Sequence, residues 1–134
     1  MQYHKTLIIS LTLLLSLVAS SNQCIKCGFE FDGDYLDPNH PGCKRTISAQ
    51  STTEIKVTGF DGKDGGACNG TDDVAWGPLD GKVTAETIVI DFSPKGGPSD
   101  LTGTLNSDEK RITWADGNYW PMYRANLKFL EKSN

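Results

Sequence analysis

The amino-acid sequence predicts an all-β domain, a small antiparallel barrel or sandwich with two disulfides. Three observations predict it: short runs that alternate apolar and polar residues, turn signals between these runs, and four cysteines in a chain of 134 residues. Alternation places one side of a run in a core and the other in solvent, as in a half-buried strand. Short strands with closely spaced turns are typical of sandwiches and small barrels.

The chain begins with a segment typical of a secretory signal peptide. Met1–Lys5 is polar with one lysine, Leu7–Val18 is an uncharged apolar run, and Ala19–Ser21 is small. This is the order of a charged start, a short apolar stretch and a cleavage site. We predict a signal peptide at 1–21 and a single secreted β domain at 22–134. The alternative is a retained membrane anchor, for which the apolar run is short.

The predicted mature domain is acidic. The net charge of the whole chain is −4 and becomes −5 once Lys5 leaves with the signal peptide. Binding to phosphate backbones needs clustered lysine and arginine. We therefore expect no nucleic-acid partner and no membrane insertion after cleavage; the expected partners are a second copy of the protein or extracellular glycans and proteins.

Strand-like alternation recurs along the domain, in runs rich in the β-branched residues that suit a pleated surface. The clearest runs are Thr53–Thr58, Thr87–Phe92, Leu101–Leu105 and Arg111–Trp114, and less regular ones are Lys44–Ser48 and Lys82–Ala85. The tail Ala125–Leu130 allows either one helical turn or a last strand.

Asp-Gly pairs mark predicted tight turns, because both residues tolerate positive φ. They are Asp61-Gly62, Asp64-Gly65, Asp80-Gly81 and Asp116-Gly117. The Gly- and Pro-rich segment Ser93–Pro98 predicts a connecting loop. A backbone nest for an anion is the alternative there, but the order of a phosphate-binding loop is missing.

The segment Ile112–Trp120 is the clearest predicted hairpin. A two-residue turn pairs Trp114 with Tyr119 and places Trp120 on the opposite face, whereas the three-residue loop 116–118 pairs Trp114 with Trp120. We favour the longer loop because it gathers the apolar side chains of the hairpin on one face. These are Ile112, Trp114, Trp120 and Met122.

All four cysteines, Cys24, Cys27, Cys43 and Cys68, follow the predicted cleavage site. An even number in a short secreted chain predicts two disulfides, with three possible connectivities. A Cys43–Cys68 bond would contribute about 3–4 kcal/mol in the chain-entropy model and leave Cys24 with Cys27. The C-x-x-C spacing of Cys24 and Cys27 also suits redox or zinc sites. It lacks a preceding strand and a second ligand pair, so we favour a structural staple, with an intermolecular link as the alternative.

Asn69-Gly70-Thr71 is an N-glycosylation sequon in a loop rich in glycine and aspartate. The export signal makes its use credible, since the transferase acts on secreted chains. We predict glycosylation at Asn69.

Several polar residues are candidates for chemistry, and each has a structural interpretation that we favour. His40 is the single histidine of the predicted mature domain, and we expect it to cap its own loop, since no G-x-S-x-G motif accompanies it. A calcium site is the alternative to a solvated acidic loop at Asp61, Asp64, Asp72 and Asp73. No spacing singles out a glycosidase pair of carboxylates. We predict no cofactor and no enzymatic activity.

Exposed aromatic side chains could stack on sugar rings, which makes them candidate ligand-binding residues. The candidates are Trp76, Tyr119, Tyr123 and, with a two-residue hairpin turn, Trp120. Packing in the core is the favoured role of each.

Three blocks of the sequence carry a resemblance. Gly33–Arg45 has the pattern G-x-Y-x-D-P-x-H-P-x-C-x-R, and the blocks Ile90–Leu101 and Ile112–Trp120 follow it. Together they resemble an uncharacterised family of small secreted β-domain proteins from algae and other protists. The resemblance implies a shared small β fold and a Cys43–Cys68 disulfide, and it carries over no catalytic residue. Cys24 and Cys27 lie outside the pattern.

These observations predict a non-enzymatic extracellular module, structural, adhesive or self-assembling, at the cell surface or in a matrix. The segment Cys24–Phe31, with its Phe29-Glu30-Phe31 alternation, could add a strand to a neighbouring subunit. The alternative function is that of a secreted protein that binds a small ligand or a carbohydrate, in the manner of a lipocalin or a lectin.

Overall fold

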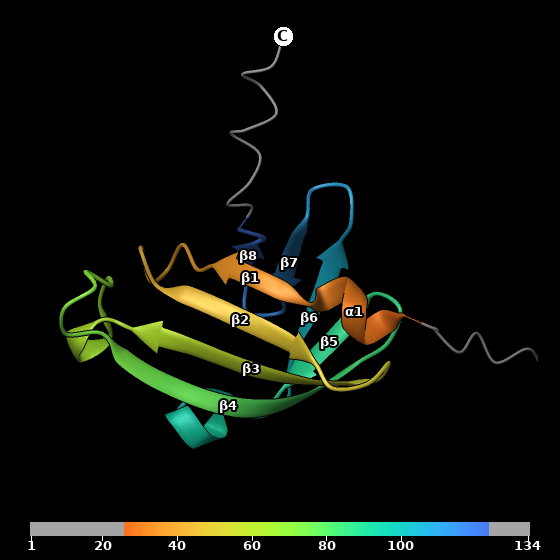
Figure 1. Ribbon diagram of the computed structural model, residues 1–134, viewed down its shortest axis with the longest axis horizontal. Coiled ribbons are helices and arrows are strands. Elements are labelled where there is room, and N and C mark those ends of the chain that lie inside the picture. Colours follow the sequence, from red (N-terminus) through yellow and green to blue (C-terminus); the bar gives the residue numbers. More distant parts are fainter. Residues whose placement is uncertain (1–25, 124–134) are drawn as a thin grey trace, which may run out of the picture.

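Eight antiparallel strands follow one another in chain order around a nearly closed barrel, as Figure 1 shows. The computed structural model describes residues 26–123. The strands are β1 (Gly33–Leu36), β2 (Lys44–Ala49), β3 (Glu54–Asp61), β4 (Val74–Val83), β5 (Thr87–Ile90), β6 (Leu101–Asn106), β7 (Arg111–Trp114) and β8 (Tyr119–Pro121). The predicted all-β fold is confirmed. The predicted signal peptide and the tail Ala125–Leu130 lie outside the described residues.

The ring closes between its first and last strands. Tyr35 of β1 forms an antiparallel bridge with Met122, and the backbone N–H of Tyr123 donates to the carbonyl oxygen of Asp34 at 2.6 Å. Closure of this kind protects the edge strands, which would otherwise expose unpaired backbone groups.

Alternation along each strand fills the barrel with apolar side chains. The largest fully buried ones on the strands include Tyr35, Ile47, Ile55, Val57, Ile88, Ile90 and Ile112. An eight-stranded barrel has an interior just wide enough for side chains to fill or for one small ligand. Here the apolar side chains occupy the middle of the barrel, so any ligand site has to lie at an end.

One disulfide, Cys43–Cys68, is present in the described residues, with an S–S distance of 1.99 Å. It joins the connection before β2 to the connection before β4. This confirms the pairing implied by the family resemblance. The sequence predicts two disulfides, and the described residues show one of them. Cys24 lies outside these residues.

Strand β4 overturns one turn prediction. Asp80-Gly81 lies in the middle of β4, where Gly81 is paired with Ile55. A Cβ atom at Gly81 would lie 2.4 Å from Cδ1 of Ile55, so the glycine makes room for a neighbour and does not bend the chain. Gly77-Pro78 forms a bulge inside the same strand, with a cis peptide bond, and does not end it.

Asp64-Gly65 and Asp116-Gly117 lie in turns, as predicted, whereas Gly62 is extended with a φ of −66°, so the tight turn follows the Asp61-Gly62 pair. Asp61 ends β3, and the 3-10 helix η1 (Lys63–Gly65) follows with positive φ at Asp64 and Gly65. Ser93–Pro98 is a connection, as predicted, and contains the 3-10 helix η2 (Ser93–Lys95).

The loop between β7 and β8 has the predicted length but a different register. Trp114 pairs with Asn118 through backbone hydrogen bonds, so the loop comprises residues 115–117, and Trp120 pairs with Ile112. The predicted Trp114–Trp120 pairing is therefore wrong, because the positive φ of Gly117 closes the loop one residue earlier. The predicted face is right: both tryptophans point inward and are buried.

The segment predicted to add a strand to a neighbour is a helix instead. Helix α1 (Cys27–Phe31) lies at one end of the barrel (Figure 1) and buries Cys27 and Phe31, while Phe29 is exposed. The Phe29-Glu30-Phe31 alternation covers only three residues. This is too few to distinguish the period of two residues of a strand from the 3.6-residue period of a helix. The hydroxyl of Tyr35 donates to the carbonyl oxygen of Phe31 at 2.8 Å and fixes the helix against β1.

We expect Tyr35→Phe to lower the free energy of unfolding by about 1–3 kcal/mol, because the carbonyl oxygen of Phe31 loses a buried donor. Urea unfolding followed by circular dichroism measures this loss. Tyr119→Phe is the matched control, since Tyr119 is exposed and such positions change stability by about 0.5 kcal/mol or less. Equal losses in the two variants would contradict the role given to the Tyr35 hydroxyl.

No helix within residues 26–123 is long and apolar enough to cross a membrane.

Candidate functional site

Four connections meet at the end of the barrel opposite α1, which we call the mouth. They join β1 to β2, β3 to β4, β5 to β6 and β7 to β8. In an antiparallel meander every second connection lies at the same end, and Figure 1 shows the first two of them on the side away from α1. The three sequence blocks that carry the family resemblance supply three of these connections.

Arg45 is the centre of the mouth. It lies at an inward position of β2 and is 1% exposed, although arginine is almost never fully buried unless it is paired. Its Nη2 donates to Asp37 Oδ2 at 3.0 Å and to Asp61 Oδ1 at 2.8 Å, and its Nη1 donates to the carbonyl oxygen of Phe60. The guanidinium carbon lies 5.1 Å from the ring centre of Trp76, close enough for a cation–π contact.

Gly59 makes this arrangement possible. A Cβ atom there would lie 2.4 Å from Cζ2 of Trp76 and 3.0 Å from Cδ of Arg45. The tryptophan ring and the arginine stem therefore cross β3 at the one place where the strand has no side chain.

Asp37 accepts four hydrogen bonds. Its Oδ1 accepts from the backbone N–H of Asn39 and from Nδ2 of Asn118, both at 3.0 Å, and its Oδ2 accepts from Nδ1 of His40 at 2.9 Å as well as from Arg45. Burial raises the pKa of Asp37, but the hydrogen bonds from Asn118 and His40 and the charge of Arg45 outweigh it, so the pKa is lowered. His40 caps its own loop, as predicted.

Asp61 joins a second cation to the mouth. Nζ of Lys95, from η2, lies 2.6 Å from Asp61 Oδ2 and 4.3 Å from the ring centre of Trp76. Burial raises the pKa of Asp61, and the hydrogen bond from Lys95 together with the charge of Arg45 lowers it further than burial raises it. The network therefore contains two cations and two carboxylates.

The lowered pKa values predict a loss of stability in acid. An unfolded aspartate has a pKa of about 3.9, and Asp37 and Asp61 titrate below their ordinary value in the folded chain. The unfolded state therefore takes up protons first as the pH falls. The stability from these groups is complete above about pH 5 and is lost below about pH 4. Urea unfolding at pH 7, 5 and 3 measures this, and Asp37→Asn should flatten the profile. A wild-type stability that is constant or rises towards pH 3 would contradict it.

A cavity of about 160 Å³ opens beside this network. One wall is aromatic: Phe92, Trp114 and Trp120 contact one another edge to face, with ring centres 4.7 to 6.1 Å apart. The Nε1 groups of both tryptophans are buried and have no hydrogen-bond acceptor within residues 26–123. Because buried N–H groups are usually paired, the packing of this wall is not optimised for a closed core.

Four polar residues also line the cavity. They are His40, Lys95, Asp116 and Asn118. Nδ1 of His40 is held by Asp37, and one oxygen of Asp116 accepts from the backbone N–H of Asn118. In the described part of the chain Nε2 of His40 and the second oxygen of Asp116 have no protein partner, so the rim keeps hydrogen-bonding capacity for a ligand.

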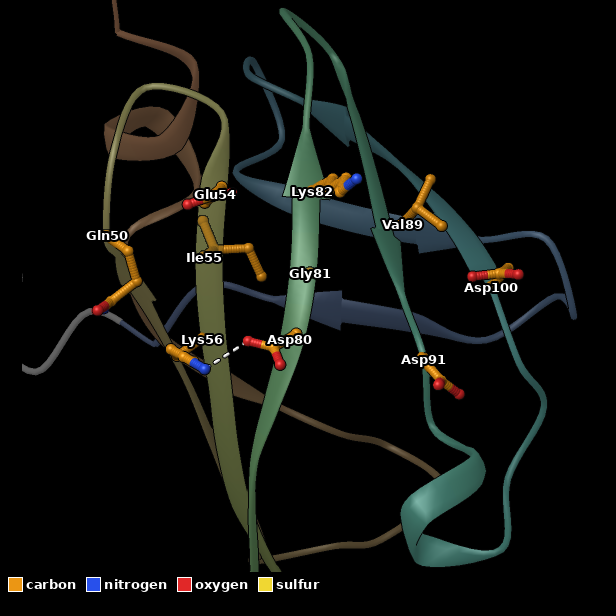
Figure 2. Close-up of a pocket in the computed structure, with 10 residues that line it drawn as sticks. All are labelled: Gln50, Glu54, Ile55, Lys56, Asp80, Gly81, Lys82, Val89, Asp91 and Asp100. Atoms are coloured by element: carbon orange, nitrogen blue, oxygen red, sulfur yellow. Dashed lines mark hydrogen bonds and ion pairs between the residues drawn. The ribbon is translucent and has the colours of Figure 1, made fainter.

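A larger hollow, of about 580 Å³, lies on the outside of the barrel across β3, β4 and β5. Figure 2 shows Lys56 reaching Asp80 across its centre, with Asp91 and Asp100 on the far side of β4. It is lined by charged side chains of both signs at outward positions of β3 and β4, namely Glu54, Lys56, Asp80 and Lys82. It has no aromatic wall and no buried polar network, so we place the candidate site at the mouth.

The structure places two of the four predicted aromatic candidates at the mouth and the other two away from the cavity. Trp120 lies in the wall of the mouth cavity, and Trp76 is half-buried against Arg45 and Phe92. Tyr119 and Tyr123 are exposed and do not line the cavity. Sequence reasoning placed Trp114 in the core and missed Arg45, whose inward position on the strand was the available signal.

The four calcium candidates are not brought together. Asp61 pairs with Arg45 and Lys95, and Asp73 accepts from the backbone N–H groups of Asn69 and Gly70 at 2.9 Å each. Asp64 and Asp72 are exposed. Among residues 26–123 no group of three or more His, Cys, Asp or Glu side chains could hold a metal ion.

Asn69 is exposed in the connection between β3 and β4. Its Oδ1 accepts from the backbone N–H groups of Thr71 and Asp72, which folds the sequon into a tight turn at the surface. Glycosylation there remains a prediction.

The fold and the site together define a class: a small antiparallel meander barrel with a polar and aromatic cavity at one mouth. Comparison of the chain with protein-family models, with curated proteins and with solved structures finds no match.

Proposed function

We propose that this is a secreted, non-enzymatic binding protein that takes a small ligand into the mouth cavity. This is the lipocalin- or lectin-like alternative of the sequence analysis. The observation that carries it is the cavity itself, which is lined by an aromatic cluster together with four polar residues. Ligand sites in proteins are concave, mostly apolar and fitted with a few convergent polar groups.

The buried charge network supports the proposal, because it holds the rim in place. Asp37 fixes His40 and Asn118 through its carboxylate oxygens, and Asp61 fixes Lys95. Three of the four polar side chains of the cavity are thus anchored to carboxylates that Arg45 links. A rim anchored in this way is preorganised, which lowers the entropic cost of binding.

Secretion is part of the proposal. The Cys43–Cys68 disulfide supports it, since such bonds persist in oxidising compartments. Expression of the full chain in a secreting cell, with N-terminal sequencing of the product in the medium, tests both export and the predicted cleavage near Ser21. Retention of the uncleaved chain in cells would contradict it.

Intrinsic tryptophan fluorescence tests the binding function, because two of the tryptophans line the cavity. A fragment library that contains sugars, organic acids, amines and alkyl compounds is titrated into the purified protein, and hits are confirmed by saturation-transfer NMR. We expect hits that are weakened by Trp114→Phe and unaffected by Tyr119→Phe, the exposed control. No hit in any chemical class would overturn the proposal.

Self-assembly at a cell surface or in a matrix remains the other prediction. Light scattering after size exclusion tests it, with a defined oligomer as the supporting result and a monomer as the contrary one.

A further inference from the structure

We infer that the ligand of the mouth cavity is one neutral sugar residue at the end of a glycan. The inference rests on the proposed binding function and names its ligand class. Three features support it: the charge balance of the mouth, the combination of aromatic and polar residues that line the cavity, and the size of the cavity.

The charge balance disfavours an anion. Arg45 is held between Asp37 and Asp61, and Lys95 is held by Asp61, so both cations are already engaged. The one carboxylate among the cavity's lining residues is that of Asp116, which forms no ion pair within residues 26–123. An anionic ligand would lose its hydration, find no unpaired cation and lie near a negative charge.

The polar lining residues of the cavity disfavour an alkyl chain as the ligand. An aliphatic ligand would cover Nε2 of His40, the remaining N–H groups of Lys95 and the second oxygen of Asp116 without bonding to them. Polar groups that lose water without a replacement partner weaken binding. A ligand with both donors and acceptors is required, because this set contains groups of both kinds.

A sugar ring can contact the aromatic lining residues and hydrogen-bond to the polar ones at the same time. Its C–H groups suit the wall formed by Phe92, Trp114 and Trp120, and its hydroxyl groups donate and accept, as His40, Lys95 and Asp116 require. A wholly polar compound such as urea would leave the aromatic wall without an apolar partner.

The size of the cavity limits the ligand to one ring. The volume of the cavity is about 160 Å³. It is smaller than the roughly 300–1,000 Å³ of pockets for drug-sized ligands. The lining residues Gly97, Pro98 and Asp116 are exposed, so the cavity reaches the surface and the rest of a glycan can extend into solvent.

The experiment compares matched methyl glycosides by saturation-transfer NMR and tryptophan fluorescence. The panel contains neutral hexosides and N-acetylhexosaminides, the corresponding hexuronides, and octanoate and octanol as alkyl probes. We expect at least one neutral glycoside to bind at least tenfold more tightly than its uronide partner. Asp116→Asn should narrow that gap by strengthening uronide binding, because it removes the nearby negative charge.

Two variants locate the binding. Trp114→Phe should weaken binding of the neutral glycoside at least tenfold. Asp116→Asn, at an exposed position, gives a second readout should the tryptophan variant fold poorly. Tyr119→Phe should leave binding unchanged. Binding that Tyr119→Phe removes and Trp114→Phe leaves intact would overturn the inference.

The outcomes separate the inference from the proposed function. If only uronides or alkyl probes bind, and Trp114→Phe weakens their binding, the mouth binds ligands but the inference of a neutral sugar is wrong. If no compound of this panel or of the fragment library binds, both fail.

Discussion

Replacement of Arg45 by methionine is expected to lower the free energy of unfolding by about 3–5 kcal/mol, the usual loss when one partner of a buried ion pair is removed. Arg45 is 1% exposed and links Asp37 and Asp61. Methionine can replace the apolar stem, but it leaves the buried carboxylate of Asp37 without its cation. Urea unfolding at pH 7 measures the loss.

The neighbouring residue supplies the control. Lys44 pairs with Asp34 at 2.8 Å, but the lysine side chain is 52% exposed. Lys44→Met should cost about 1 kcal/mol or less, as surface ion pairs do. The difference in stability between Arg45→Met and the wild type should narrow as the pH falls below about 4, because the unfolded chain then takes up protons that the ion-paired carboxylates of the folded wild type resist. Similar losses for the two substitutions at pH 7 would show that Arg45 does not hold the mouth together.

Loss of the Cys43–Cys68 disulfide is expected to cost about 3–4 kcal/mol. The two cysteines are 25 residues apart, and closing a loop of that length removes entropy from the unfolded chain. The variant carries Cys43→Ala and Cys68→Ala together, so that no thiol is left to form another bond. Thermal and urea unfolding of the oxidised proteins measure the difference.

Ligand binding gives this variant a second readout. The disulfide ties the connection before β4 to the loop that contains His40, so its loss should also weaken any ligand of the mouth. Ser48→Ala, at an exposed position of β2, is the control for stability and for binding. Unchanged stability in the double variant would contradict the structural role of the bond.

Alternation was sufficient to predict most of the barrel. Thr53–Thr58, Thr87–Phe92, Leu101–Leu105 and Arg111–Trp114 each fall on an observed strand, because a buried face imposes period two on its sequence. Lys44–Ser48 is also a strand. Strand β8 has three residues, too few to show a period, and β1 buries just one of its four residues, Tyr35, so neither strand shows an alternating apolar face.

The two structural uses of glycine explain why the turn prediction at Asp80-Gly81 failed. At Asp64-Gly65 the pair adopts positive φ, whereas at Gly81 the same signal reflects the close approach of Ile55. A local sequence cannot distinguish the two uses, because the second depends on a residue of the neighbouring strand.

The site was harder to predict than the fold, because its contacts join distant parts of the chain. Asn118 donates to Asp37 across 81 residues, and Lys95 reaches Asp61 across 34. A pattern in the sequence can show that Arg45 points inward. It cannot show which carboxylates will meet it there, since that depends on how the strands are ordered around the barrel.

The order of the strands also bears on how the barrel forms. Each strand pairs with the next one along the chain, so seven of the pairings within the described sheet can assemble as successive hairpins. The two ends of the sheet are joined by the bridge between Tyr35 and Met122 and by the hydrogen bond from Tyr123 to Asp34. Pairing of distant segments carries the larger loop-closure entropy and slows folding. Closure of the ring is therefore the step at which we expect the folding transition state to lie, and substitutions at this seam should slow folding more than they speed unfolding.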